Sequence, residues 1–519
     1  ESSAASDVYK RQLQDIALEQ MAAMKKFHEL DIPHSGFYAE GAGATFYGEY
    51  KKEELYKVVS FGERHGFKVF SWQFPNMTQE LAQELLPECP KEELPITRNK
   101  NDEEEKLPVY IDFSHPRAKE LLAAQWKDRL DAGIRGSMVD FGDVVPDEAV
   151  FYDGRRGDEM HNAYAYQYAK NYRELFEQKY GDDHVLYTRG AAPGSQHFAC
   201  QFGGDQLTSF QGLKYAIAGG LSAAASGLPF WGVDAGGYDG FPDQETYLRW
   251  TEYAAFCPLM RFHGTEPREP WEYDAFTVKV YRYYTWLREN LRPYIVSVAA
   301  EAHKLGIPMM RPLAMMYPED QEATKVWDEY LFGEDLLVAP VSDETEEREI
   351  YFPEGRWISL WNLNDEISGP VQRSVEVPID KIPVYIREGS FLPLRLNESL
   401  KLGESMSESE TEMILAVVPQ NDSIVKETLY ERSGAKTCCG MEKNGETIQL
   451  QISGRTAELY VMLAGIHWKN TEAIVNGRTL TKVTAREGLY FTEGYLELEE
   501  GILVKINPSA ESVIKIQKK

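Results

Sequence analysis

The sequence predicts an α/β protein: a (β/α)8 TIM barrel followed by C-terminal antiparallel β-sandwich domains. The chain has 519 residues, which is too long for one hydrophobic core and predicts about two to four domains. Over its first half, apolar runs of strand length alternate with helical patterns, as in βα units around a parallel sheet. Beyond residue 306 short strands lie between Gly, Pro and Asp turns, a pattern typical of antiparallel sandwiches.

The barrel is predicted at 12–305. Residues 1–11 are small and polar, and we interpret them as a linker or a non-native segment. A helix is expected next, because apolar side chains recur at helical spacing from 12 to 30. The segment 85–107 is rich in Glu, Lys, Pro and Asn and predicts a loop insertion, whereas the helical pattern at 275–305 is expected to close the barrel. The predicted strands are 35–38, 68–72, 136–141, 185–188, 228–233 and 258–262.

Two β-rich domains are predicted after the barrel, a proximal one at 306–395 and a distal one at 396–519. In the distal domain, alternation of apolar and polar residues indicates half-buried strands. The segments with strand patterns are 330–338, 348–352, 357–361, 383–386, 458–463 and 502–506.

Composition argues against several classes of partner. The formal net charge is −28, and such a surface repels phosphate backbones and anionic lipid, so we predict no nucleic-acid and no membrane partner. No stretch approaches about 20 consecutive apolar residues, the length that spans a bilayer. The five cysteines have neither zinc-site nor disulfide spacing, and no signal peptide is visible, so a cytoplasmic location is favoured. A homo-oligomer stays open.

Three acids follow predicted barrel strands or lie in the loops after them. Asp140 follows GIRGSMV, Asp205 lies in ACQFGGDQ, a loop after Arg189, and Asp234 follows LPFWGV. Catalytic residues of a parallel barrel sit where the strands run into the βα loops. Two carboxylates in one pocket can cleave a glycosidic bond, since one attacks the anomeric carbon and the other protonates the leaving oxygen. An Asp after a strand is also a common helix N-cap or turn residue, so the pattern alone leaves both interpretations open.

At these residues the sequence resembles glycoside hydrolase family 31, a clan of α-glucosidase-, α-galactosidase- and sulfoquinovosidase-like enzymes. MVDFGD at 138–143 resembles the family's nucleophile segment, and its Asp-Phe-Gly-acid form is closer to the sulfoquinovosidase branch. TRGAAPGSQHFACQFGGDQLTSFQGL at 188–213 resembles the acid/base region. LPFWGVDAGGY at 228–238 and RWTEYAAFCPLMRFHG at 249–264 resemble the next two strands, and YLFGEDLLVAPV at 330–341 resembles the start of the first C-terminal domain.

The resemblance implies a retaining, exo-acting α-glycosidase that works by double displacement on a small-molecule or oligosaccharide substrate. Asp140 would be the nucleophile, and Arg189 beside it would favour its charged form. Asp205 would be the general acid/base. No metal ion or organic cofactor is implied. The remaining candidates for substrate binding are Asp234 and His263, as partners of sugar hydroxyls, and Phe202, Trp231 and Tyr238, as pocket walls or as plain packing.

The sequence departs from the family pattern at three positions. Met138 stands where the family usually has Trp, Asp143 is shorter than the family's Glu, and Gly41 stands where α-glucosidases and sulfoquinovosidases commonly place Asp. The sugar specificity therefore stays open, and a non-catalytic carbohydrate-binding relative with a degenerate subsite is the alternative. The family's N-terminal β-sandwich and first barrel strand are not found before residue 12, so we expect an N-terminally truncated barrel that lacks its first strand.

Overall fold

The chain forms two compact units, residues 1–204 and residues 205–519. The predicted linker at 1–11 and the departure at Gly41 lie outside the described residues, as do residues 99–107 of the predicted loop insertion. The computed structural model describes residues 13–39, 52–98, 109–407, 412–421, 423–455 and 457–519.

Five parallel strands form the sheet of the N-terminal unit, in the order β1-β2-β5-β6-β7. β5 is buried at all four positions, as expected for a strand whose two faces are both covered. The sequence predicts four of these strands and assigns a loop to the fifth, β7, because polar Gln201 interrupts its short apolar run. The strands are β1 (Gly36–Tyr38), β2 (Lys68–Gln73), β5 (Gly136–Val139), β6 (Val185–Thr188) and β7 (Cys200–Phe202).

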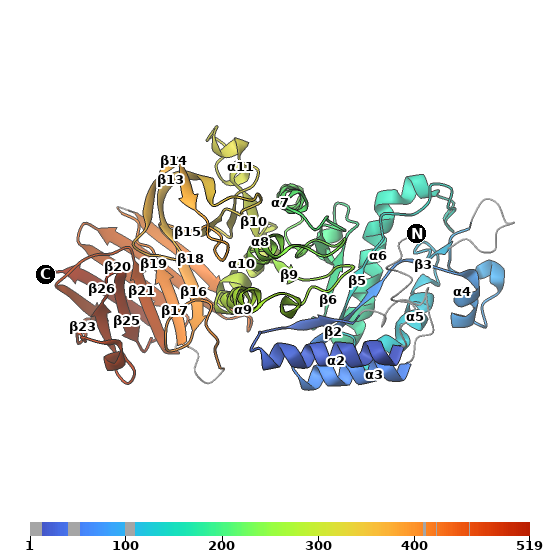
Figure 1. Ribbon diagram of the computed structural model, residues 1–519, viewed down its shortest axis with the longest axis horizontal. Coiled ribbons are helices and arrows are strands. Elements are labelled where there is room, and N and C mark those ends of the chain that lie inside the picture. The colour runs from blue at the N-terminus through green and yellow to red at the C-terminus, as the bar shows by residue number, and fades with distance from the viewer. Residues whose placement is uncertain (1–12, 40–51, 99–108, 408–411, 422, 456) are drawn as a thin grey trace. The chain divides into compact units, whose positions relative to one another are not determined.

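Helices pack on this sheet. α2 and α3 lie side by side, and α3 contacts β2 (Figure 1). α5 ends at Ala132, because the next residue, Gly133, has a left-handed φ of 105°. Between α5 and α6 the indole of Trp126 donates a hydrogen bond of 3.0 Å to the hydroxyl of Tyr172 within the core. The remaining elements are α2 (Leu13–Glu29), α3 (Lys52–Arg64), α4 (Gln79–Leu85), α5 (Ala118–Ala132), α6 (Gly157–Tyr180) and the antiparallel pair β3 (Asn76–Met77) and β4 (Val109–Tyr110).

The C-terminal unit begins with two parallel strands and four helices. The side chains of Ser209, Asp243 and Asp274 cap three of these helices by accepting hydrogen bonds from the first turn. The pattern predicted as one helix at 275–305 is two helices, since Pro293 has no N–H to donate and its ring blocks continuation. The elements are α7 (Phe210–Ala225), β8 (Trp231–Asp234), α8 (Gln244–Ala255), β9 (Leu259–Arg261), α9 (Ala275–Asn290) and α10 (Arg292–Leu305).

Three sheets follow in the C-terminal unit. The first has the order β10-β11-β12-β15-β13-β14 and is antiparallel throughout. The predicted strand at 330–338 is a hairpin of β11 and β12, and the patterns at 348–352 and 357–361 fall on one long strand, β13. Its strands are β10 (Met310–Pro312), β11 (Tyr330–Phe332), β12 (Leu336–Val338), β13 (Glu347–Ser359), β14 (Glu366–Glu376) and β15 (Val384–Arg387).

The other two sheets share one hydrophobic core, as the layers of a sandwich do. Their orders are β16-β17-β21-β25-β24 and β18-β19-β20-β26-β22-β23, and only the β17–β21 pair among those described is parallel. The strands are β16 (Phe391–Leu396), β17 (Glu412–Val417), β18 (Ile424–Tyr430), β19 (Lys436–Asn444), β20 (Thr447–Ser453), β21 (Leu459–Ala464), β22 (Thr471–Val475), β23 (Arg478–Thr479), β24 (Gly494–Glu497), β25 (Gly501–Ile506) and β26 (Glu511–Lys518).

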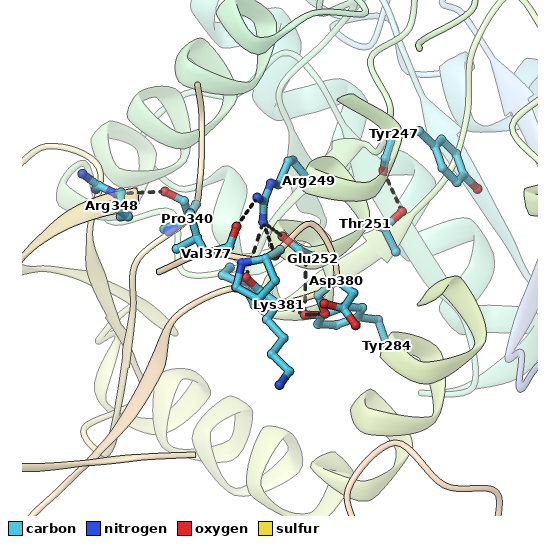
Figure 2. Close-up of polar contacts among 12 residues, drawn as sticks. Tyr247, Arg249, Thr251, Glu252, Tyr284, Pro340, Arg348, Val377, Asp380 and Lys381 are labelled. Carbon is cyan, nitrogen blue, oxygen red and sulfur yellow. Dashed lines mark hydrogen bonds and ion pairs between the residues drawn. The ribbon is translucent and has the colours of Figure 1, made fainter. Parts of the chain in front are cut away.

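A buried polar network joins α8 and α9 to the segment between β14 and β15 (Figure 2). Arg249 contacts Glu252 at 3.1 Å and donates to the carbonyl of Val377 at 2.7 Å. The hydroxyl of Tyr284 donates to the carbonyl of Asp380 at 3.1 Å. Burial raises the pKa of Glu252 to about 8. Backbone carbonyls that would otherwise lack partners away from water are therefore satisfied by side chains.

Candidate active site

Asp140 lies at the carboxyl end of β5 and is 5% exposed. Its backbone N–H donates to the carbonyl of Gln73 at 2.8 Å, which extends the pairing of β2 and β5 by one residue. The indole Nε1 of Trp72 donates to its Oδ2 atom at 3.0 Å, and the backbone N–H of Phe141 donates to its Oδ1 atom at 2.8 Å. These contacts orient a carboxylate at a strand end, where parallel barrels place their catalytic groups.

Arg189 follows β6 and lies against Asp140. Its Nε atom is 3.7 Å from Oδ1 of Asp140, and its Nη2 atom is 3.4 Å from Oδ1 of Asp143. The guanidinium carbon is 4.4 Å from the centroid of the Phe141 ring, a cation–π arrangement. The structure therefore brings Asp140 and Arg189 together, and Asp143 reaches the same cation although it is shorter than the family's Glu.

Two residues that contact Arg189 have left-handed backbone conformations. Phe141 has a φ of 57°, a left-handed conformation that bulky residues rarely adopt and that costs about 1–3 kcal/mol. Gly204 has a φ of 78°, and a Cβ atom there would lie 2.9 Å from Cδ of Arg189. Such conformations persist where the surrounding structure requires them, often at functional sites.

Trp72 contacts the candidate nucleophile Asp140, and the sequence analysis did not single it out. It pairs in register with Met138, so it lies beside β5 near the end that carries Asp140. The signal that could have found it is its position near the end of the predicted strand 68–72. The family's Trp is Met138 here, and the indole of Trp72, across the strand ladder, donates to the carboxylate. Phe202 ends β7, is 2% exposed and packs edge to face on Tyr187 at 6.0 Å.

Asp234 and Arg261 form a buried ion pair in the C-terminal unit. Asp234 ends β8 and pairs in register with Arg261, the last residue of β9. The Nη2 atom of Arg261 contacts Oδ1 of Asp234. Since both side chains are removed from water, each charge is stabilised by the other. The sequence singled out Asp234 alone, although Arg261 lies in the predicted strand 258–262.

His263 follows β9 and lies beside Tyr238, with ring centroids 5.4 Å apart. Burial, together with the charges of Arg261 and Arg268, lowers the pKa of His263 to about 3. The ring is therefore neutral near pH 7, and a neutral imidazole offers one donor and one acceptor nitrogen. This combination suits hydrogen bonds to hydroxyl groups.

Asp205 is exposed and begins the loop that leads to α7. The carbonyl of the next residue, Gln206, accepts hydrogen bonds from the N–H groups of Tyr238 at 2.7 Å and Asp239 at 3.3 Å. The structure thus joins the loop of Asp205 to the loop that carries Tyr238.

Trp231 lies at the amino end of β8, whereas Asp234 lies at the carboxyl end. The two residues are three steps apart along the strand, which corresponds to about 10 Å. The indole packs on α7, where a Cβ atom on Gly220 would lie 2.7 Å from its Nε1 atom. Trp231 therefore packs on α7 at the end of β8 away from Asp234.

Within the described ranges, no group of three or more His, Cys, Asp and Glu side chains could hold a metal ion. No helix in that part of the chain is long and apolar enough to cross a membrane.

Comparison with known families decides what kind of barrel this is. The family model described as "Glycosyl hydrolases family 31 TIM-barrel domain" matches residues 12–298, and the model of the "Glycosyl hydrolase family 31 C-terminal domain" matches residues 306–392. The chain belongs to glycoside hydrolase family 31. The predicted fold class, a TIM barrel followed by antiparallel β domains, is thereby confirmed.

Curated family 31 members resemble the chain over much of its length. The isomaltosyltransferase of Sporosarcina globispora is 32% identical over 430 residues, which are 78% of this chain and 39% of the relative. The sulfoquinovosidase of Escherichia coli K12 is 32% identical over 54% of this chain and 43% of the relative. The chain thus spans about two fifths of the length of these curated family 31 relatives.

Solved family 31 structures share the fold. The cycloalternan-forming enzyme from Listeria monocytogenes, in complex with a pentasaccharide substrate, superposes with a TM-score of 0.87 at 23% identity. The match covers 97% of this chain and 53% of that enzyme. The family 31 dextranase of Flavobacterium johnsoniae gives a TM-score of 0.85, also at 23% identity, over 97% of this chain and 69% of the dextranase.

Proposed function

We propose that the protein containing this chain is a retaining, exo-acting α-glycoside hydrolase in which Asp140 forms a covalent glycosyl-aspartate. The observation that carries the proposal is the environment of Asp140. Its carboxylate is buried at the end of a strand, accepts hydrogen bonds from two donors and lies beside the Arg189 cation. A carboxylate nucleophile has to be ionised and aimed at one carbon atom. Charge-assisted hydrogen bonds and a neighbouring cation hold such a carboxylate in one orientation.

In the proposed first step an oxygen of Asp140 attacks the anomeric carbon, and Asp205 donates its proton to the leaving oxygen. In the second step Asp205 takes a proton from water, and the water oxygen displaces Asp140 from the anomeric carbon. Each step inverts the configuration, so the product retains the configuration of the substrate. Retention requires the two carboxyl groups to lie about 5–5.5 Å apart.

The proposed roles of Asp234 and His263 are hydrogen bonds to sugar hydroxyls. The neutral ring of His263 can donate to one hydroxyl oxygen or accept from another. Arg261 holds the carboxylate of Asp234 at the end of β8, which fixes the direction of any hydrogen bond it accepts.

The acceptor of the second step decides between hydrolysis and sugar transfer. The names of the relatives include an isomaltosyltransferase, α-xylosidases and sulfoquinovosidases, so both outcomes occur among the proteins this chain resembles. We propose water as the main acceptor. Chromatography of the products from aryl α-glucoside, α-xyloside, α-galactoside and α-sulfoquinovoside would identify the sugar and detect any transfer product.

Two substitutions test the assignment of the acids. Asp140→Ala and Asp205→Ala should each abolish turnover of a natural α-glycoside, whereas Asp147→Ala, at an exposed acid of the same loop as Asp143, should leave it unchanged. Added azide should rescue both variants on an activated aryl glycoside. The Asp140 variant should give the β-glycosyl azide by one inversion, and the Asp205 variant should give the α-glycosyl azide by two.

Normal turnover by Asp140→Ala would overturn the proposal. Saturable sugar binding by the full-length protein, with no turnover of any of these glycosides, would instead identify a non-catalytic carbohydrate-binding relative.

A further inference from the structure

Arg268 is a buried arginine whose guanidinium is surrounded by backbone carbonyl groups. It follows β9 and is 6% exposed. Its Nη2 atom lies 2.6 Å from the carbonyl oxygen of Gly240, and its Nε and Nη2 atoms lie 3.0 and 2.8 Å from that of Gly237. The carbonyl oxygens it contacts in all are those of Gly237, Tyr238, Gly240, Glu266 and Pro267.

These carbonyls belong to two loops of the C-terminal unit. One is the loop after β8, which contains Tyr238, and the other is the loop after β9, which contains His263. A second contact between the same loops is the hydrogen bond of 2.8 Å from the N–H of Thr265 to the carbonyl of Tyr238. The guanidinium therefore holds the two loops in one arrangement, with several donors in a rigid plane.

The loop after β8 is in turn joined to the loop of Asp205. Besides the two hydrogen bonds to the carbonyl of Gln206, the hydroxyl of Thr208 donates to the carbonyl of Asp239 at 2.8 Å. Leu207 and Asp239 also form a parallel β-bridge. The chain of contacts thus runs from the guanidinium of Arg268, through residues 237–240, to the residue next to Asp205.

Close approach of the backbones fixes this arrangement. A Cβ atom on Gly237 would lie 2.6 Å from the carbonyl oxygen of Leu207. The loop after β8 and the loop of Asp205 are therefore in backbone contact, with no room for a side chain at residue 237. A Cβ atom on Gly264 would lie 2.4 Å from Nη2 of Arg268. Glycine at 264 therefore leaves the space in which the guanidinium sits.

We propose that Arg268 is a positioning residue that holds Asp205 in place for proton donation, acting through the loop at 237–240. The inference rests on the proposed function, in which Asp205 is the general acid. A displacement of about 1 Å in a reacting group can cost about 100-fold in rate, so a loosened loop has a large effect on chemistry without any direct contact with substrate.

The test uses the dependence of the rate on the leaving group, measured in the full-length protein. A glycoside with a poor leaving group needs protonation of the leaving oxygen by Asp205. A 2,4-dinitrophenyl glycoside does not, because the 2,4-dinitrophenolate ion leaves without being protonated. Arg268→Lys should lower kcat/KM by about 10- to 100-fold for the poor leaving group and by less than about threefold for the dinitrophenyl substrate. Lysine keeps the charge but offers donors from a single nitrogen, so it cannot keep the contacts with the carbonyls of Gly237, Tyr238 and Gly240 together.

A second variant perturbs the same contact from the other side. Gly264→Ala keeps Arg268 but pushes its guanidinium away from the carbonyls, and it should show the same dependence on the leaving group. The matched control is Arg249→Lys. Arg249 is also buried and also donates to backbone carbonyls, but these belong to the segment between β14 and β15 (Figure 2). It should lower stability and leave the leaving-group dependence unchanged.

Comparison with Asp205→Ala separates the two hypotheses. If Asp205→Ala shows no leaving-group dependence, the acid/base assignment in the proposed function fails. If Asp205→Ala shows it and both Arg268→Lys and Gly264→Ala lower the rates of the two substrates equally, the positioning role of Arg268 is refuted. In the double variant Asp205→Ala/Arg268→Lys, the substitution of Arg268 should not increase the dependence of the rate on the leaving group beyond that of Asp205→Ala, because Arg268 acts through Asp205.

Discussion

Replacing Trp72 by Phe removes one hydrogen bond from the carboxylate of Asp140 and little else. The indole Nε1 atom donates to Oδ2 of Asp140 at 3.0 Å. Its ring lies 4.6 Å from that of Phe74 and 6.1 Å from that of Phe141, contacts that a phenyl ring can largely keep. The substitution therefore tests whether this donor orients the proposed nucleophile.

The size of the effect follows from the type of bond. A hydrogen bond to a charged group contributes about 1.5–3 kcal/mol, and about 1.36 kcal/mol corresponds to tenfold in rate. If the carboxylate has to be held in one orientation for attack, Trp72→Phe should lower kcat/KM by about 10- to 150-fold. The assay is steady-state hydrolysis of an aryl α-glycoside, with the unfolding free energy measured in urea to show that the variant is folded.

Trp126→Phe is the matched control. The indole of Trp126 also donates at 3.0 Å, but to the hydroxyl of Tyr172 in the core. Its loss should reduce stability and leave kcat/KM within about threefold of the unmodified protein, which is less than 1 kcal/mol. If Trp72→Phe kept full kcat/KM, or if the two variants lost activity equally, the orienting role of Trp72 would be refuted.

Two further predictions concern stability. Gly136→Ala, in β5, would place a Cβ atom 2.2 Å from the carbonyl oxygen of Val185. The resulting overpacking should lower the unfolding free energy, measured by urea denaturation, by about 1–3 kcal/mol. An unchanged urea midpoint would contradict the close approach of β5 and β6 at this residue. Burial and the charges of Arg261 and Arg268 lower the pKa of His263 to about 3 in the folded protein. Between about pH 3 and about 6.5 the unfolded chain therefore binds more protons than the folded protein. The unfolding free energy should rise with pH across this window. His263→Gln should make that rise less steep, and an unaltered slope would show that His263 titrates normally in the folded protein.

Most barrel elements could be predicted because their signals are local. Buried strands such as β6 at 185–188 are short apolar runs, and the helices around them repeat apolar residues at helical spacing. β7 was missed because three residues, with polar Gln201 in the middle, carry no periodic signal. The two helices at 275–305 share one apolar pattern, so the break was not predicted although Pro293 marks it.

The candidate site was predicted only where a motif names its residues. The resemblance placed Asp140 and Arg189 in the motifs at 138–143 and 188–213, and their charged atoms lie 3.7 Å apart. Trp72 lies 68 residues before Asp140 in the chain and has no motif of its own. Arg268 lies 31 residues after Gly237, and the carbonyls it binds carry no side-chain signal at all.

The sequence by itself determined the order of the βα elements, the family and the acids at the strand ends, because burial patterns and motifs are written in short consecutive segments. Only the tertiary structure decided which groups surround each acid. Trp72 reaches Asp140 because β2 and β5 are neighbours in a particular register, and a shift of one residue would turn the indole to the opposite face of the sheet. Hydrogen-bond partners from separate strands and loops meet only after the chain has folded, so no local pattern can encode them.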